Sequence, residues 1–440
     1  MNEVWILALL PRLSLFGALL LIAVSVPFVI SFNFYPIIIG AIAFIGLVSY
    51  LLISNKLTLD NFIVILLGFT TLPQSVAGGQ LNVSISDLLL VVVILGLLLI
   101  KNADIEVPKF FFTISVLYIL FSLFSMVNSE NIGNSLIRLS QYTQYIIVTV
   151  IVFYNIKSSD IIKKTLFTYV VLASVVSVAS IVIALKDGLI GTPLFVLGYQ
   201  KNNLGAAVGY AIPLIIGLKQ LQAKQKWLNI ALLLNTACLL LSMSRGALLG
   251  SVFATLILLL LLKKYRTFFA ALLAVGVGGL FLLKTLPENI IASVTNFSTD
   301  SSAYSRITIY QDAIRKIKDH IFFGNGVGDY MIKLPYINFQ QDDPSNVFLL
   351  NLVELGIVGF VLFLILIITI FVTAIRNNKL FSDNRIFLLL NAICFSGFLA
   401  RFIHIQADVT WVRGASMFMF AMVGMMFALR RIYFKMQKGR

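Results

Sequence analysis

The amino-acid sequence predicts an all-α integral membrane protein, a polytopic helical bundle of about 12–14 transmembrane helices with one large extracytoplasmic loop. Composition is the first observation behind this prediction. Of the 440 residues, 60% are hydrophobic and only 12% are charged, and the mean hydropathy is +0.99. A soluble protein of this length cannot bury so much apolar surface. The second observation is that long apolar runs recur without the alternation that barrel strands require.

The apolar runs also predict where the spans lie. We expect helices near residues 13–30, 35–53, 60–72, 84–100, 110–126, 139–155, 165–185, 204–218, 228–242, 247–262, 267–285, 347–374, 386–403 and 411–429. The runs at 60–72 and 228–242 are shorter than the roughly 20 residues that a straight crossing needs. Twelve spans is therefore the alternative to fourteen.

The basic residues predict the orientation of these spans. With the N-terminus in the cytoplasm, 21 of the 33 basic residues fall on the cytoplasmic side, five lie in the long loop and only 7 lie in short outer segments. We therefore expect both termini in the cytoplasm. We interpret the formal charge of +15 as part of this topology, because the basic residues lie in short segments between spans. We therefore predict no nucleic-acid partner. The first apolar run, Leu13 to Ile30, is too long for a signal peptide and has no small-residue cleavage site.

We expect residues 1–440 to form a single polytopic membrane domain, with residues 286–345 as the large extracytoplasmic loop. This loop should contain an amphipathic helix capped by Ser305. Its apolar residues at helical spacing are Ile307, Tyr310, Ile314 and Ile317. Gly324, Gly326 and Gly328 follow in FGNGVGD, which lacks the Lys-Ser/Thr of a phosphate loop and is better interpreted as a tight turn.

Several basic residues are predicted at the outer ends of spans. These are Arg138, Lys201, Arg245, Arg401 and Arg413, with Arg306 in the loop. Clustered guanidinium groups suit a phosphate or pyrophosphate, because the planar fork binds such oxygens in a bidentate manner. The alternative for each is snorkelling to the interface or an ion pair with an acidic residue. Arg245 lies in LSMSRGALLG between two apolar runs, where a buried arginine needs a partner.

Other polar residues are candidates for proton transfer. Arg401, His404 and Asp408 are spaced to share one helix face, either for proton handling or as an interfacial polar girdle. Glu354 lies about two turns into a span and should face other helices or a polar cavity. Asp342, Asp343 and Ser345 precede that span at the membrane surface. No His, Cys or Glu set has metal-ligand spacing, so we predict neither a metal nor a cofactor. Both cysteines, Cys238 and Cys394, should be buried as small apolar residues.

Four segments in this order resemble the O-antigen ligase and polymerase superfamily of bacterial membrane glycosyltransferases. They are GYQKNNLGAAVGYAIPL, LSMSRGALLG, YSRITIYQDAIRKIKDHIFFGNGVGDY and SNVFLLNLVELGIVGF, and the N-terminal half is similar only as a row of spans. The resemblance implies a GT-C-like membrane fold in the bacterial inner (plasma) membrane. It also implies transfer of a glycan from undecaprenyl pyrophosphate at the outer face. A flippase and a chain-length regulator are then the expected protein partners, in addition to membrane lipid.

The resemblance also implies site residues. Arg245 and Arg306 match the arginines that would stabilise the leaving pyrophosphate. Substrate-binding candidates are Lys201, Asn203, Arg401, Ser345 and Asn346, and the candidates for activating the acceptor are Asp342, Asp343, Glu354 and His404. Ligases of this family have a histidine where this chain has Ser345, which is a poor base on its own. We therefore predict a polymerase of repeat units. The alternatives are a ligase for a lipid or protein acceptor, and a transporter or flippase of lipid-linked sugar.

Overall fold

The computed structural model describes residues 107–438, except 190–195, 197–198, 223–224, 286–300, 334–339, 342 and 409–412, together with residues 63, 64, 66–68 and 70. The predicted spans 13–30, 35–53 and 84–100, and most of 60–72, lie outside these ranges.

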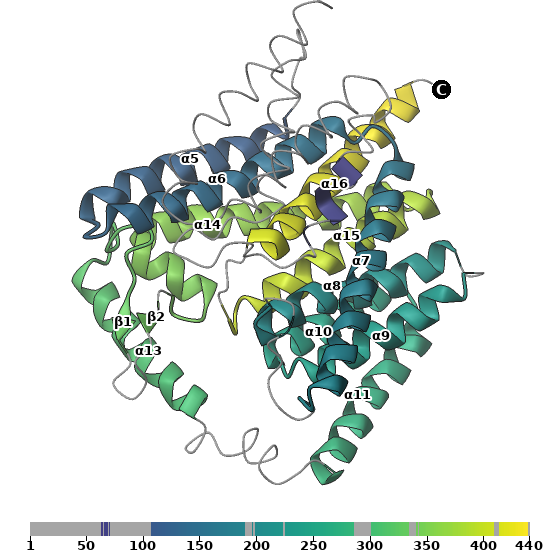
Figure 1. The fold of residues 1–440 in the computed structure, drawn as a ribbon. Helices are drawn as coiled ribbons and strands as arrows, with labels where there is room; N and C mark the ends of the chain where they lie inside the picture. Colours follow the sequence, from purple (N-terminus) through teal and green to yellow (C-terminus); the bar gives the residue numbers. More distant parts are fainter. Residues whose placement is uncertain are drawn as a thin grey trace, which may run out of the picture.

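The described chain is almost entirely helical (Figure 1). The helices are α5 (Lys109–Ser125), α6 (Ile132–Asn155), α7 (Ser159–Lys186), α8 (Lys201–Leu221), α9 (Trp227–Leu241), α10 (Arg245–Leu261), α11 (Tyr265–Thr285), α13 (Ser301–Asp319), α14 (Val347–Leu380), α15 (Arg385–His404) and α16 (Arg413–Lys438). Seven of them are long and apolar enough to cross a membrane, whereas α9, α10 and the apolar part of α11 are shorter. The predicted fold class, an all-α polytopic membrane protein, is confirmed.

Polar side chains set where several helices begin. Asn131 accepts a hydrogen bond from the backbone N–H of Asn134 at the start of α6, and Asn384 does the same for Phe387 in α15. Such caps satisfy N–H groups that have no partner inside the helix. Because of the Asn131 cap, α6 begins about two turns before the predicted residue 139. This places Arg138 within the helix, where it is buried.

Helix α15 lies at the centre of the described bundle, in contact with α7, α8, α10, α14 and α16 (Figure 1). Every residue from Leu389 to Arg401 is buried. Glycines allow the close approach: a Cβ at Gly250 of α10 would lie 2.2 Å from the carbonyl oxygen of Ala400. Both cysteines, Cys238 and Cys394, are free thiols buried in this bundle, as predicted.

Helix α14 is broken at Gly356, where the backbone takes φ 61° and ψ −168°. Glycine is the residue that reaches this region without steric cost. The break frees backbone groups that a continuous helix would satisfy internally, and a buried polar group without a partner is costly.

The glycine-rich turn after α13 supplies the missing partners. The N–H groups of Asn325 and Gly326 donate to the carbonyls of Val353 and Glu354, each at 3.0 Å, and Ile357 donates to the carbonyl of Ile321 at 2.8 Å. Gly324, Gly326 and Gly328 all have positive φ. The predicted tight turn is confirmed, and its structural role is to bond to the broken helix, backbone to backbone.

Helix α13 packs on α14 through Ile309 and Ala313, which form a small core with Tyr330 and Val353. The predicted cap at Ser305 is wrong, because the helix already begins at Ser301. The predicted apolar face is partly wrong as well. Tyr310 and Ile317 are partly buried, but Ile307 and Ile314 are exposed because the 309–313 face meets α14 instead. A two-residue antiparallel pair, β1 (Ile332–Lys333) and β2 (Gln340–Gln341), precedes α14.

Candidate functional site

The C-terminal end of α15 carries the most unusual group of polar side chains. Arg401 is completely buried, and its Nη1 lies 3.1 Å from Nδ1 of the buried His404. Helix α15 ends at His404, so the predicted shared helix face does not extend to Asp408. The turn still keeps Asp408 beside the pair, because its N–H donates to the carbonyl of His404 at 3.1 Å.

Positive charges from three helices act on Asp408. The side-chain amide of Asn202, near the start of α8, donates to its Oδ2. Burial raises the pKa of the Asp408 carboxyl, and the charges of Arg401, Arg306 and Lys201 each act to lower that pKa. These cations are close enough to act on one carboxylate, although they are about 100 or more residues apart in sequence.

Two further segments contact the same end of α15. The side chain of Asn346, which caps α14, donates to the carbonyl of Gln406 at 3.0 Å, and Val347 N–H donates to the carbonyl of Ile405 at 3.2 Å. On the other side, a Cβ at Gly246 would lie 2.8 Å from Cδ2 of His404. Arg245, the first residue of α10, therefore begins its helix against His404.

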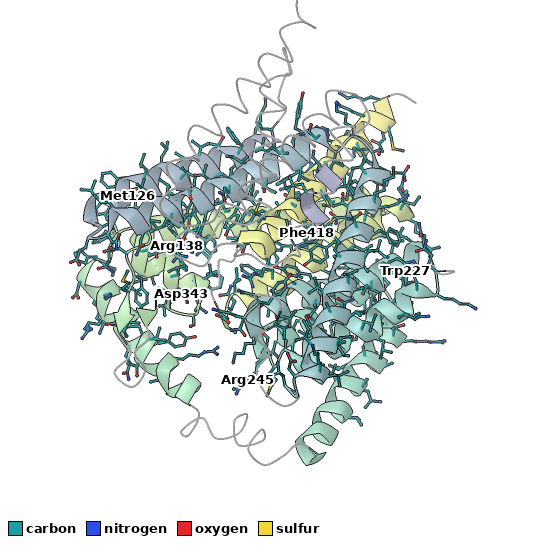
Figure 2. The ribbon with its side chains drawn as sticks, in the orientation of Figure 1. Met126, Arg138, Trp227, Arg245, Asp343 and Phe418 are labelled. Atoms are coloured by element: carbon teal, nitrogen blue, oxygen red, sulfur yellow. The ribbon has the colours of Figure 1, made fainter. Side chains whose placement is uncertain are left out.

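The predicted site residues are placed as follows. Lys201, Arg306, Arg401 and His404 lie around Asp408, and Asn346 bonds to the adjacent turn. Arg245 is exposed and projects from the end of the bundle on the side where α13 lies (Figure 2). Asn203 follows Asn202 on α8, and its Oδ1 is buried without a hydrogen-bond donor in the described part of the chain.

Asp343 and Ser345 form a local turn at the start of α14. An Asp343 carboxylate oxygen accepts a hydrogen bond from the backbone N–H of Ser345 at 2.7 Å. Ser345 has φ 53°, a conformation that such a side-chain bond helps a non-glycine residue to adopt. This turn leads directly to the Asn346 cap and so holds the start of α14 beside α15. Asp342 lies outside the described residues.

Glu354 lies in a separate polar centre at the break in α14. It is completely buried, and its Oε1 is 3.9 Å from Nε of Arg138 on α6. One turn before it, Asn351 accepts a hydrogen bond from the hydroxyl of Tyr118 on α5 at 2.6 Å. The glycine-rich turn bonds to the Glu354 backbone carbonyl. Glu354 thus links α14 to its neighbours next to the break.

From the sequence, Arg138 was named only among the basic residues suited to a phosphate and Asp408 only as part of a polar helix face, and Asn202 was not singled out. The sequence around Asp408 could have indicated a functional residue, because an acidic side chain at the end of an apolar run is costly without partners. Its link to Asn202 had no local signal, since the two residues are 206 positions apart. Among the residues that the structure describes, no group of three or more His, Cys, Asp or Glu could hold a metal ion.

A protein-family model matches part of the chain, and no curated protein matches it. The matched family is described as O-antigen ligase and covers residues 230–364. This range extends from α9 through the glycine-rich turn to the first half of α14, and it includes Arg245, Arg306 and Glu354. Residues 230–364 of this membrane protein match the O-antigen ligase family, and this match supports the O-antigen ligase and polymerase superfamily.

Proposed function

We propose that this protein polymerises oligosaccharide repeat units carried on undecaprenyl pyrophosphate at the outer face of the bacterial plasma membrane, making O-antigen, capsule or exopolysaccharide. The family match supports membrane glycan transfer in general. The observation that carries the finer proposal is the convergence of Lys201, Arg306 and Arg401 on the single carboxylate of Asp408.

The charges of this cluster suit a pyrophosphate. The charges of three cations act on one carboxylate, and Arg245 precedes Gly246, the α10 residue that packs against His404. A pyrophosphate leaving group gains negative charge as its bond to the sugar breaks. Guanidinium and ammonium groups fixed in place before the reaction stabilise that charge.

The reaction needs a proton acceptor as well as cations. The attacking sugar hydroxyl forms a new C–O bond at the anomeric carbon and loses its proton, while the bond to the pyrophosphate breaks with inversion. Asp408 is the group we assign to take that proton. Burial raises its carboxyl pKa, which makes the carboxylate a stronger base than an ordinary aspartate. Asp342, Asp343, Glu354 and His404 are the candidates for this step that were predicted from the sequence.

The choice between polymerase and ligase rests on Ser345. The superfamily's ligases have a histidine here, whereas this chain has a buried serine bonded through its N–H to Asp343. A serine hydroxyl does not accept a proton efficiently without a neighbouring base. Ligation to a separate acceptor is the second candidate, because the matched family is described as O-antigen ligase.

The test uses the full chain in nanodiscs with a polyprenyl-pyrophosphate-linked oligosaccharide as the only sugar substrate. A polymerase should yield a ladder of products at multiples of the repeat unit, with release of polyprenyl pyrophosphate. Products formed only after a separate lipid acceptor is added would instead establish ligation. No new covalent product under either condition would overturn the proposal and favour a transporter.

Matched aspartate variants make the result specific to the site. Asp408→Asn should abolish the ladder, because an amide cannot take the proton. Asp383→Asn removes an exposed carboxylate from the turn between α14 and α15, at the other end of α15, and should leave the ladder unchanged. A normal ladder with Asp408→Asn would remove Asp408 from its proposed role.

A further inference from the structure

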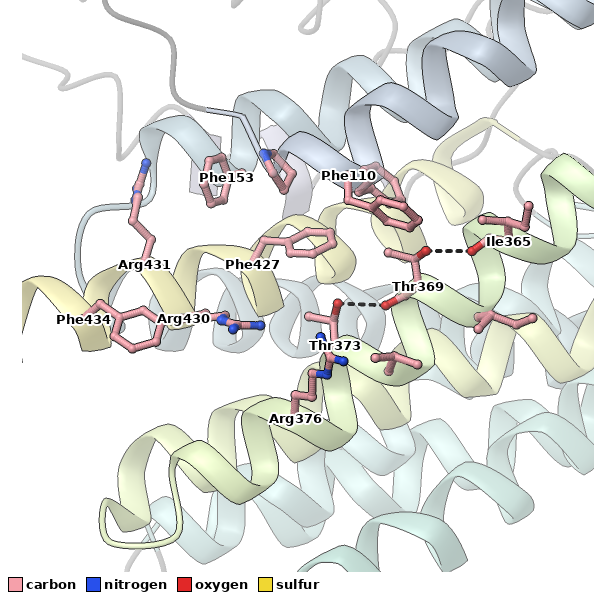
Figure 3. A pocket seen from close by; sticks show the side chains of 14 residues that line it. Phe110, Phe153, Ile365, Thr369, Thr373, Arg376, Phe427, Arg430, Arg431 and Phe434 are labelled. Atoms are coloured by element: carbon pink, nitrogen blue, oxygen red, sulfur yellow. Dashed lines mark hydrogen bonds between the residues drawn. The ribbon is translucent and has the colours of Figure 1, made fainter.

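A second site lies at the other end of the bundle from the Asp408 cluster. An open cavity of about 670 Å³ is lined by residues of α5, α6, α14 and α16, and its volume is within the range typical of ligand pockets (Figure 3). It borders the C-terminal halves of α14 and α16, whereas the Asp408 cluster lies where α14 begins and α15 ends. The proposed glycan chemistry does not use this cavity.

The walls of the cavity are apolar. Phenylalanines from α5, α6 and α16 line it, including Phe110, Phe153 and Phe427 (Figure 3). The two hydroxyls from α14 are turned back to their own helix, since Thr369 donates to the Ile365 carbonyl and Thr373 to the Thr369 carbonyl, each at 2.7 Å. The polar atoms of these threonines are therefore satisfied, and a hydrocarbon chain can pack against the wall.

One end of the cavity is basic. Arg376 of α14 and Arg430 of α16 extend toward one another there (Figure 3). Arg376 is exposed, and Arg430 is partly buried with its guanidinium carbon 5.7 Å from the centre of the Phe434 ring. Within the described ranges, no carboxylate forms an ion pair with either arginine.

A third arginine has a structural role beside them. Arg431 donates to the carbonyls of Tyr154 at 3.2 Å and Ile156 at 2.7 Å, and it lies over the Phe153 ring. These bonds satisfy carbonyls at the C-terminal end of α6, which have no partner inside that helix. Arg431 therefore holds one wall of the cavity in place, and Arg376 and Arg430 are left to bind a ligand.

We propose that this cavity binds an anionic phospholipid of the surrounding bilayer, with an acyl chain between α5, α14 and α16 and the phosphate on Arg376 and Arg430. A basic pocket between transmembrane helices recognises such a head group through its phosphate. The bilayer supplies phospholipid directly to an open cavity between helices that are long and apolar enough to span it. The polyprenyl pyrophosphate, by contrast, is expected at the opposite end, beside Asp408.

The test measures lipid preference on the purified full chain. Protein in detergent is titrated with phosphatidylglycerol or with zwitterionic phosphatidylcholine, and thermal unfolding reports binding. The wild type should bind phosphatidylglycerol in preference. The variant Arg376→Gln with Arg430→Gln should lose about tenfold or more in apparent affinity for phosphatidylglycerol, because charge-assisted hydrogen bonds are lost. Affinity for phosphatidylcholine should change little.

Two controls separate a site from general charge effects. The variant Lys263→Gln with Lys264→Gln removes the same charge from the exposed turn between α10 and α11 and should keep the preference. Val372→Trp fills the cavity wall and should weaken binding of both lipids while Arg376 and Arg430 remain. Equal loss in the arginine and lysine variants, or a wild type without preference, would overturn the proposal. A polyprenyl phosphate that displaces phosphatidylglycerol at lower concentration would also overturn it, because the occupant would then be the carrier.

Discussion

The glycine-rich turn offers a direct test of how the broken helix α14 is held. Gly324 has φ +71°, and a Cβ there would lie 2.2 Å from the carbonyl oxygen of Glu354 and 2.5 Å from the backbone nitrogen of Leu355. Both are backbone atoms of α14, so neither can rotate away as a flexible side chain can. In Gly324→Ala the turn must therefore move away from the break.

The expected loss of stability has two parts. A non-glycine residue in the left-handed region costs about 1–2 kcal/mol. Moving the turn also breaks the bonds from Asn325 to the Val353 carbonyl and from Gly326 to the Glu354 carbonyl, each 3.0 Å long. Such hydrogen bonds contribute about 0.5–1.5 kcal/mol each. Gly324→Ala should therefore destabilise the protein by about 2–5 kcal/mol.

Substitutions at two other glycines separate the conformational cost from the cost of the lost hydrogen bonds. Gly188, after α7, has φ +64° with nothing within 4 Å of an added Cβ, so Gly188→Ala should cost only the conformational part, about 1–2 kcal/mol. Gly276, inside α11, has open space and ordinary helical φ, so Gly276→Ala should be neutral or stabilising by up to about 1 kcal/mol.

The measurement is thermal unfolding of the three purified variants in the same detergent, with the yield of polymer as a second readout. We expect Gly324→Ala to have the lowest unfolding temperature, Gly188→Ala an intermediate one and Gly276→Ala the highest. If Gly324→Ala unfolds no earlier than Gly188→Ala, the turn does not brace the break in α14. Polymer should fall with Gly324→Ala, because the same segment of α14 carries Asn346 to the end of α15.

Three further predictions concern the polar centres. Arg245→Lys keeps the positive charge but loses the planar guanidinium that binds two oxygens at once, so the amount of polymer on a gel should fall at least about tenfold at unchanged protein abundance. A normal amount of polymer would show that bidentate binding by Arg245 is not needed. Because the raised pKa of Asp408 belongs to a base, activity should rise with pH through that pKa, and Arg306→Gln should move this rise to higher pH by removing a charge that lowers the pKa. If the pH at which activity rises is unchanged in Arg306→Gln, the charge of Arg306 does not act on Asp408. Glu354→Gln should cost about 3–5 kcal/mol in thermal unfolding, and Arg138→Met with Glu354→Met should recover most of it. If the double variant makes polymer again, Glu354 is a positioning residue. If the double variant is stable but makes no polymer, Glu354 takes part in catalysis.

Much of the fold was predictable because it depends on local properties of the chain. A run of apolar residues must form a helix in lipid, since no water is present to bond its backbone. All ten spans predicted after residue 109 coincide with helices of the described chain. The helix in the loop and the glycine turn were also predictable, because amphipathic spacing and glycine act over a few residues. The motif order that indicates the family is equally a property of the sequence alone.

The composition of the site was decided by tertiary structure. The sequence placed Lys201 and Asp408 near the ends of different spans and Arg306 in the long loop, with nothing local to link the three. Only the tertiary structure, in which α8 packs on α15 and α13 packs on α14, brings their charges together.

The break in α14 has the same cause. Helix α14 breaks at Gly356, where the distant 321–326 turn offers the backbone partners that the break requires. By itself the sequence determined which segments enter the membrane and which residue types are available for chemistry, since burial and helix formation act locally. Which of those residues meet was decided by long-range backbone and charge contacts, because these depend on how the helices pack and leave no periodic pattern in the chain.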